Sequence, residues 1–143
     1  MKKFVFTLQK LYDVKQSEEK QKRIELKEMG RSLTAFRKQR KANQSVFDRQ
    51  HGIYEKKCKS GMTMNEVKQY GDYFQYLERE MREQDAAILR LEADMEACKK
   101  ELIRLINEKN VLDRIRGEQI QEYRKEVQKN DDKMIEDFMQ ARL

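Results

Sequence analysis

The residue types that usually carry catalysis are sparse in this sequence of 143 residues. It contains one histidine, His51, and two cysteines, Cys58 and Cys98. A single histidine has no second imidazole for a metal site or a catalytic triad, so we interpret His51 as an exposed residue or one at the edge of a helix contact. The cysteines have no metal-ligand spacing and no disulfide framework, which favours reduced thiols.

Adjacent carboxylates and glycines also give no sign of a catalytic centre. Pairs such as Glu18 with Glu19 and Asp131 with Asp132 occur in a chain of which 41% is charged, where they normally lie on a solvated helix face. The five glycines are widely separated and form no phosphate-binding loop. We therefore predict a protein that is not an enzyme and has no cofactor, no metal and no small-molecule substrate.

The composition favours long helices with a thin core. Hydrophobic residues make up 38% of the chain, below the roughly 45–50% of an average globular domain, and proline is absent. Lys, Glu, Gln, Arg and Met, which are strong helix formers, are abundant. No apolar run approaches the roughly 20 residues that span a bilayer, and the first residues lack the apolar core of a secretory signal. This pattern predicts a cytoplasmic protein.

An apolar stripe with strict 3-4 spacing begins at Val67 and predicts a coiled-coil seam. Eleven of its twelve positions are apolar, whereas random placement at 38% would give about four or five, so we reject disorder. The positions are Val67, Tyr70, Phe74, Leu77, Met81, Gln84, Ile88, Leu91, Met95, Cys98, Leu102 and Leu105.

The first half carries the same rhythm less cleanly, and a turn signal separates the halves. Its positions are Leu26, Met29, Leu33, Phe36, Arg40, Asn43, Phe47, Gln50 and Tyr54. Gly61 can end a helix, and Thr63 with Glu66 forms a capping box for the next one. We predict an all-α single domain over 1–143, a long antiparallel two-helix coiled-coil hairpin with helix 1 at about 3–58, a turn at about 59–63 and helix 2 at about 64–141.

The position of the turn predicts which residues face each other. If the turn centres on Gly61, the numbers of facing residues sum to about 122. Arg40 then lies opposite Arg82, and Gln84 opposite Lys38, which places the polar interruptions of both seams in one layer. Such a layer can fix the register, but so many cations need a carboxylate nearby. The candidates are Glu80, Glu83 and Asp85.

The second helix is expected to overhang the first by roughly twenty residues, with an apolar stripe that has no partner left in the chain. The stripe consists of Ile120, Tyr123, Val127, Met134 and Phe138. An amino-terminal arm offers its own apolar residues, namely Phe4, Phe6, Leu8, Leu11 and Tyr12. Either this arm packs against Val111, Leu112 and Ile115 and closes the open end of the hairpin, or it shares a partner surface with the overhang.

The net charge of +6 is unevenly distributed. The first 60 residues hold 17 Lys and Arg against 7 Asp and Glu, and the remainder holds 15 against 19, so the two halves attract each other. The basic cluster at residues 37–41 comes with no zinc-finger spacing, stacking sheet or uninterrupted basic zipper. We therefore predict that the protein does not bind nucleic acid. A basic helical nucleic-acid binder is the third-ranked hypothesis.

The sequence resembles the FliJ family of small coiled-coil stalk proteins of the flagellar type III export apparatus, on the basis of three groups of residues that follow one another along the chain. The first is Phe4-Val5-Phe6 with Leu8, Leu11 and Tyr12. The second is Lys59-Ser60-Gly61-Met62 leading into Val67, Tyr70, Tyr73, Phe74 and Leu77-Glu78. The third is Glu122-Tyr123-Arg124 with Asp131-Asp132, Met134 and Phe138. The resemblance covers essentially the whole chain.

This resemblance implies a stalk that inserts into the pore of the hexameric export ATPase, promotes its assembly or activity, and links it to the membrane export gate and to export chaperones. The protein would be largely monomeric alone and peripherally associated with the inner face of the cell membrane. Its ATPase-ring contacts would be Phe4, Phe6, Leu8, Leu11, Tyr12, Ile120, Tyr123, Val127, Met134 and Phe138. Its export-gate contacts would be Tyr70, Tyr73, Tyr76, Leu77, Glu80 and Gln84.

The alternative is a generic structural coiled coil, a scaffold that homodimerises through its carboxy-terminal overhang. The overhang stripe discriminates between the two hypotheses. A scaffold would use it for self-association, which depends on protein concentration, whereas a stalk would stay largely monomeric and stimulate an ATPase.

Overall fold

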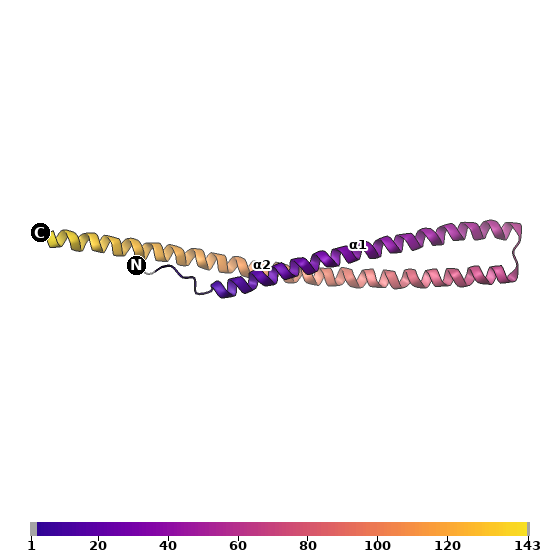
Figure 1. The fold of residues 1–143 in the computed structure, drawn as a ribbon, viewed down its shortest axis with the longest axis horizontal. Coiled ribbons are helices and arrows are strands. Elements are labelled where there is room, and N and C mark those ends of the chain that lie inside the picture. The colour runs from indigo at the N-terminus through magenta and orange to yellow at the C-terminus, as the bar shows by residue number, and fades with distance from the viewer. Residues whose placement is uncertain (1–2, 143) are drawn as a thin grey trace. The chain divides into compact units, whose positions relative to one another are not determined.

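The computed structural model describes residues 3–142, which form two helices and no strand. Helix α1 spans Gln9–Ser60 and helix α2 spans Met64–Arg142 (Figure 1). The predicted all-α fold of two long helices packed against each other is confirmed. Residues 1, 2 and 143, at the ends of the predicted domain, lie outside the described range.

Contacts group the chain into two units, which we describe separately. Unit 1 joins the residues up to Arg23 with those from Glu101 onward, and unit 2 is Ile24–Lys100. Unit 2 therefore contains the turn and the helical segments next to it. Unit 1 contains the start of α1 and the carboxy-terminal part of α2. Within the described range, no helix is long and apolar enough to cross a membrane.

The turn in unit 2 has the chemistry that the sequence predicts. Gly61 has φ of 99°, the left-handed conformation that glycine adopts without steric cost. Thr63 caps α2, because its Oγ1 accepts a hydrogen bond from the Glu66 N–H at 3.2 Å. Helix α1 continues to Ser60, past the predicted end near 58, so the non-helical residues 61–63 are centred on Met62 rather than on Gly61.

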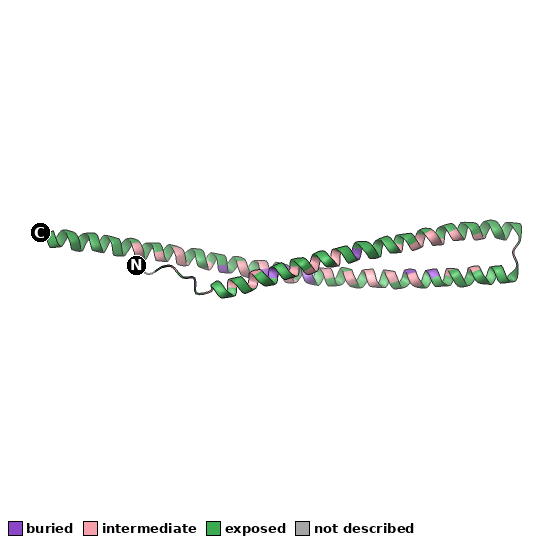
Figure 2. Cartoon of the chain, viewed as in Figure 1, coloured by how far each residue is buried: buried purple, intermediate pink, exposed green. Residues whose placement is uncertain are grey.

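The seam of unit 2 follows the predicted 3-4 rhythm. Leu33, Leu77, Met81 and Cys98 are buried, and the other predicted α2 positions from Tyr70 to Met95 are half-buried. Val67, next to the turn, is 36% exposed and marks the end of the seam. In Figure 2, the buried and half-buried residues of this unit recur along each helix at regular intervals between exposed ones.

A polar layer interrupts this seam, but its pairing differs from the prediction. Asn43 donates a hydrogen bond to Gln84 at 3.1 Å, so Gln84 faces Asn43 and not Lys38. Arg40 lies 2.8 Å from a carboxylate oxygen of Asp85 and donates to the sulfur of Met81 at 3.1 Å, so Arg82 is not its partner. A turn centred on Met62 raises the sum of facing residue numbers only from 122 to 124, so these side chains also reach along the opposite helix to their partners. Asp85 is one of the carboxylates that the prediction required.

The seam of unit 1 is apolar on one side and charged on the other. Helix α2 contributes the buried Leu102, Leu105 and Leu112, of which Leu105 is 1% exposed. Residues 15–23 of α1 include no apolar side chain, and yet Glu19 in this stretch is only 7% exposed. The aliphatic stems of long charged side chains can cover apolar surface while their charged ends are paired. In this way a stretch of α1 without apolar residues can face the leucines of α2, whereas Leu112 lies beside Leu11.

Helix α1 begins at Gln9 and not near residue 3, because the preceding residues form an extended strap, which we define as residues 3–8. The ring of Phe4 lies 5.6 Å from that of Tyr123, and the Tyr12 ring lies 5.9 Å from Lys109 Nζ. Between those two contacts α2 advances by about 21 Å, whereas a helix from Phe4 to Tyr12 would span only about 12 Å. An extended chain, at about 3.3 Å per residue, makes up most of that difference.

Candidate partner-binding surfaces

His51, Cys58 and Cys98, whose side chains could carry chemistry, lie against other side chains of the protein. Among residues 3–142, no group of three or more His, Cys, Asp and Glu side chains could hold a metal ion. The ring of His51 lies 6.0 Å from Phe47 and 5.7 Å from Phe74, and its Nδ1 is 3.4 Å from Glu55. Neither cysteine forms a disulfide, and Cys98 is buried in the seam. His51 is therefore part of an aromatic contact between the helices.

Six rings form a cluster beside the turn of unit 2, which we call the aromatic cluster. Its members are Phe47, His51, Tyr54, Tyr70, Tyr73 and Phe74. Phe47 and Phe74 meet edge to face at 5.3 Å, and Tyr54 lies 5.4 Å from Tyr70. Lys57 Nζ lies 5.4 Å from the Tyr70 ring centre, and the hydrogen bond with Tyr70 raises the Lys57 pKa. Aromatic pairs of this geometry stiffen the end of the hairpin.

The predicted export-gate set divides into exposed and covered residues. Tyr73 is 40% exposed and Tyr76 is 48% exposed, whereas Tyr70 is half-buried inside the aromatic cluster. Leu77 is 4% exposed and belongs to the seam, so a partner cannot reach it while the helices stay paired. Glu80 and Gln84 are half-buried, and Gln84 is bound to Asn43. Tyr73 and Tyr76 therefore offer most of the surface of this set.

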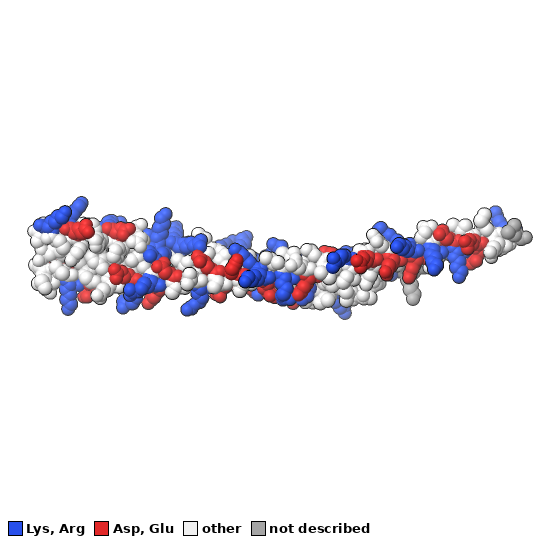
Figure 3. All heavy atoms as spheres, turned by 180° about the vertical axis from the view of Figure 1, so that it is seen from behind, with Lys and Arg blue, Asp and Glu red and all other residues white. Residues whose placement is uncertain are grey.

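The space-filling view shows where charged residues are sparse. Figure 3 shows residues other than Lys, Arg, Asp and Glu gathered at the turn end of unit 2, with charged residues at their borders. The exposed rings of Tyr73 and Tyr76 belong to this end of the unit, and exposed apolar surface that is contiguous marks protein contact sites.

The carboxy-terminal part of α2 carries four exposed apolar side chains, which we call the distal patch. Met134 is 70% exposed, Ile135 59%, Phe138 61% and Met139 64%. The prediction named Met134 and Phe138 and missed Ile135 and Met139, although the four-residue spacing of the latter two places them on one helix face. The Arg142 guanidinium stacks 5.0 Å from the Phe138 ring. All residues from Asp131 to Arg142 are exposed (Figure 2).

The rest of the predicted ATPase-ring set lies against the strap or beneath it. Phe6 is 6% exposed, and Phe4 is half-buried on Tyr123. Four further members are half-buried, namely Leu8, Tyr12, Ile120 and Val127. Leu11 remains 44% exposed. The stripe that the sequence left without a partner is thus covered at Ile120–Val127 and open from Met134 onward.

The interpretation in which the amino-terminal arm closes the hairpin fits most of its predicted contacts. Leu112 is 7% exposed and Ile115 is half-buried, whereas Val111 is 45% exposed and lines a depression together with Leu11 and Leu112. The strap itself contacts α2 through the rings of Phe4 and Tyr123. A partner would meet the distal patch first.

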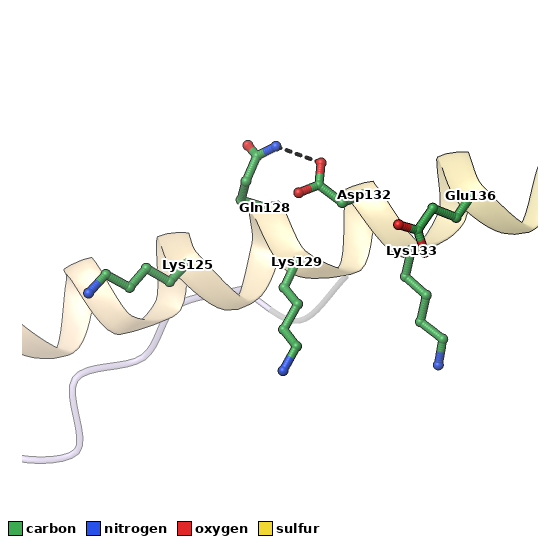
Figure 4. A pocket seen from close by; sticks show the side chains of 6 residues that line it. All are labelled: Lys125, Gln128, Lys129, Asp132, Lys133 and Glu136. Carbon is green, nitrogen blue, oxygen red and sulfur yellow. Dashed lines mark hydrogen bonds between the residues drawn. The ribbon is translucent and has the colours of Figure 1, made fainter.

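A shallow depression on α2 lies beside the distal patch. The side chains that line it are Lys125, Gln128, Lys129, Asp132, Lys133 and Glu136. All come from one helix, and Figure 4 shows Lys129 and Lys133 extending to the same side, away from the 3.0 Å hydrogen bond that Gln128 donates to Asp132. A surface built by one exposed helix suits contact with another protein better than enclosure of a small molecule.

Paired charges replace apolar contacts in the seam of unit 1. Lys109 Nζ lies 2.7 Å from Glu19 Oε2 and Arg23 lies 2.9 Å from Glu19 Oε1. Hydrogen bonds from Lys109 and Arg23 hold the pKa of the Glu19 carboxyl below its ordinary value, and Glu19 in turn raises the pKa of Lys109. Lys15 pairs with Glu108 at 2.7 Å and lowers the Glu108 pKa.

Comparison with known families gives one match. The model of a family described as "Flagellar FliJ protein" matches residues 4–142. The match includes the strap, both helices and the turn. The comparisons with curated proteins and with solved structures found no match.

Proposed function

Because the chain belongs to the flagellar FliJ family, whose members are flagellar export proteins, we propose that it is the non-enzymatic stalk and adaptor of a flagellar type III export apparatus. The family match over residues 4–142 carries this proposal, because it includes both candidate surfaces. In this role the protein works in the cytoplasm, at the inner face of the membrane. It brings the export ATPase, the membrane export gate and export chaperones together.

The distal patch is the surface that we assign to the hexameric export ATPase. Beyond the strap, α2 presents exposed apolar side chains at Met134, Ile135, Phe138 and Met139. A lone helix is about 10–12 Å across with its side chains, a size suited to the central pore of a ring. Insertion would bury the patch on the ring subunits and promote ring assembly or ATP turnover.

The exposed rings of Tyr73 and Tyr76 are the surface that we assign to the export gate. Both belong to α2 just after the turn, on a hairpin end that the aromatic cluster stiffens. Aromatic side chains on a rigid support lose little conformational entropy on binding, which makes them effective anchors. One protein would thus contact its two partners through separate units.

The test is an ATPase assay and a pull-down with the export ATPase from the same genome. We expect the protein to bind the hexamer and raise its ATP turnover. The double variant Ile135→Asp, Phe138→Asp should lose about tenfold or more in affinity, because apolar anchors dominate such interfaces. Arg116→Asp, at an exposed α2 position of unit 1 outside the patch and the depression, is the matched control. Absence of both binding and stimulation by the unchanged protein would refute the proposal.

The exposure of the distal patch also supports a second candidate, a structural scaffold that homodimerises through this patch. A scaffold should sediment as a dimer at high concentration, and Phe138→Asp should make it monomeric. The stalk proposal expects a largely monomeric protein at the concentrations at which it stimulates the ATPase. Sedimentation of the unchanged protein and of the Phe138→Asp variant decides between the scaffold and the stalk.

A further inference from the structure

A second 3-4 rhythm runs along the outer side of α1 in unit 2. Its positions are Ile24, Glu28, Arg31, Ala35, Lys38, Ala42, Ser45, Arg49, Gly52 and Lys56. All are exposed, whereas the α1 residues of the seam between the two helices lie about half a turn away around the helix. We call these positions the outer face. It extends along α1 for roughly 48 Å, at 1.5 Å per residue.

The outer face alternates small side chains with long cationic ones. The cations are Arg31, Lys38, Arg49 and Lys56, and the small residues are Ala35, Ala42, Ser45 and Gly52. A side chain added at Gly52 would meet no atom within 4 Å, so the space above the helix is open there. Glu28 is the one carboxylate in the face.

These cations lack the partners that the cations nearer the seam have. Arg37 lies 2.7 Å from Glu92, and Arg40 lies 2.8 Å from Asp85, both across to α2. The side chains of Arg31, Lys38, Arg49 and Lys56 make no hydrogen bond, ion pair or ring contact within residues 3–142. The second helix therefore does not neutralise the outer face.

We propose that the outer face docks an acidic helix of a partner protein. The 3-4 rhythm is the pattern by which one helix follows another, and the small residues let a second backbone approach to the usual 8–10 Å between helix axes. The row of unpaired cations selects carboxylates on that helix. A second copy of this chain is a poorer occupant, because its net charge is +6 and its more acidic helix, α2, already pairs with its own α1.

A nucleic acid would use the same cations without needing small residues between them. Phosphate binding depends on the density of Lys and Arg, not on a 3-4 rhythm of Ala, Ser and Gly. The regular placement of small residues therefore favours a helix over a duplex. The docking proposal is independent of the stalk function, since it involves neither the distal patch nor Tyr73 and Tyr76.

The probe is a synthetic helical peptide with four glutamates on one face. The cations follow one another at intervals of 7, 11 and 7 residues, a spacing that reads the same in both directions, so one peptide serves for parallel and antiparallel docking. A second peptide has the same composition with the glutamates scattered around the helix. We expect the full-length protein to bind the first peptide at least about tenfold more tightly than the second in a fluorescence anisotropy titration. Equal binding would overturn the proposal.

Charge reversal then locates the binding surface. Changing Arg31, Lys38, Arg49 and Lys56 together to Glu should reduce affinity for the first peptide by about tenfold or more. The matched control reverses four exposed cations of α2 in the same unit, namely Arg79, Arg82, Arg90 and Lys100. It has the same net charge and should retain most of the affinity. Equal losses in the two variants would mean attraction by net charge alone and would contradict the proposal.

Two further measurements separate a helix from other anionic partners. Ala35→Phe with Ala42→Phe keeps every charge but prevents close approach, and it should weaken peptide binding several-fold while circular dichroism shows unchanged helix content. Unchanged affinity would exclude helix docking. A labelled DNA duplex and vesicles containing anionic lipid serve as competitors at physiological salt. Tighter binding of either competitor through the same four cations would assign the face to that partner and overturn the proposal.

Discussion

The seams of the two units have opposite chemistry. In unit 2, both helices contribute apolar or aromatic side chains, such as Leu33 and Phe47 from α1 and Phe74 and Met81 from α2. In unit 1, α2 contributes leucines, whereas the facing stretch of α1 contributes paired charges. Unit 2 therefore depends mainly on apolar packing, with one polar layer at Asn43 and Gln84, whereas unit 1 depends on packing from one helix and electrostatics from the other.

This difference has consequences for stability and for function. Apolar packing is insensitive to pH, while ion pairs with shifted pKa values link stability to pH. We therefore expect acid to open unit 1, which contains the proposed ATPase-binding end, more easily than unit 2.

The largest effect should come from removing the central leucine of the unit 1 seam. Leu105 is 1% exposed, and Leu105→Ala should cost about 2–5 kcal/mol of unfolding free energy, because α1 has no apolar side chain there to fill the cavity. Urea unfolding measures the total cost, and amide hydrogen exchange shows where it falls. Leu77→Ala, at 4% exposure in unit 2, is the comparison.

The two variants should loosen different amides. Leu105→Ala should speed exchange at residues 101–142, and Leu77→Ala should speed it beside the turn. If both variants loosened all amides equally, the two seams would unfold as one, and the contrast between the units would have no energetic meaning.

A smaller effect is expected from the strap. Phe6 is 6% exposed, and Phe6→Ala should cost about 1–3 kcal/mol, less than a fully enclosed phenylalanine, because an extended segment on one helix is easily released. Amides near Ile120 and Tyr123 should then lose protection. Val5→Ala, at a neighbouring position that is 73% exposed, should change little. Unchanged protection in the Phe6 variant would show that the strap does not cover α2 in solution.

The sequence predicted the parts of this molecule that local patterns determine. The 3-4 stripe of α2 identified its buried positions, and Gly61 with Thr63 identified the turn, because helix periodicity and capping depend on nearby residues. The strap escaped prediction because its extended conformation is stabilised by contact with Tyr123, far away in the sequence. The predicted pairings of Arg40 and Gln84 were wrong because the side chains that bond across the seam depend on side-chain reach and helix geometry as well as on the count of residues from the turn.

In the candidate surfaces too, local patterns predicted some features, and contacts between residues far apart in the sequence escaped prediction. Tyr73 and Tyr76, two of the gate contacts that the family resemblance implies, fall outside the seam rhythm and are exposed. The burial of Glu19 was not predicted, since a search for apolar periodicity passes over a carboxylate whose partners lie on another helix. Which partners bind these surfaces depends on other proteins and stays a proposal.

The smallest expected effect tests the charged side of the unit 1 seam through pH. Because Lys109 and Arg23 lower the Glu19 pKa, the stabilisation by ionised Glu19 is complete above its unfolded-state pKa of about 4.3. It is lost as the pH falls through the lower pKa of the folded state. The wild-type protein should therefore lose stability between about pH 5 and pH 3. The lowered pKa values of Glu101 and Glu108 act in the same direction.

The variant Glu19→Gln isolates this contribution, because the amide cannot titrate but keeps the side-chain volume. It should be less stable than wild type at pH 7, and the difference should shrink as the pH falls below about 4, as measured by urea midpoints. Glu78→Gln, at an exposed position of unit 2, should change the pH profile little. If the two variants had the same pH profile, the pairing of Glu19 with Lys109 would not distinguish unit 1. The electrostatic half of the contrast would then fail, and the leucines would remain as its only basis.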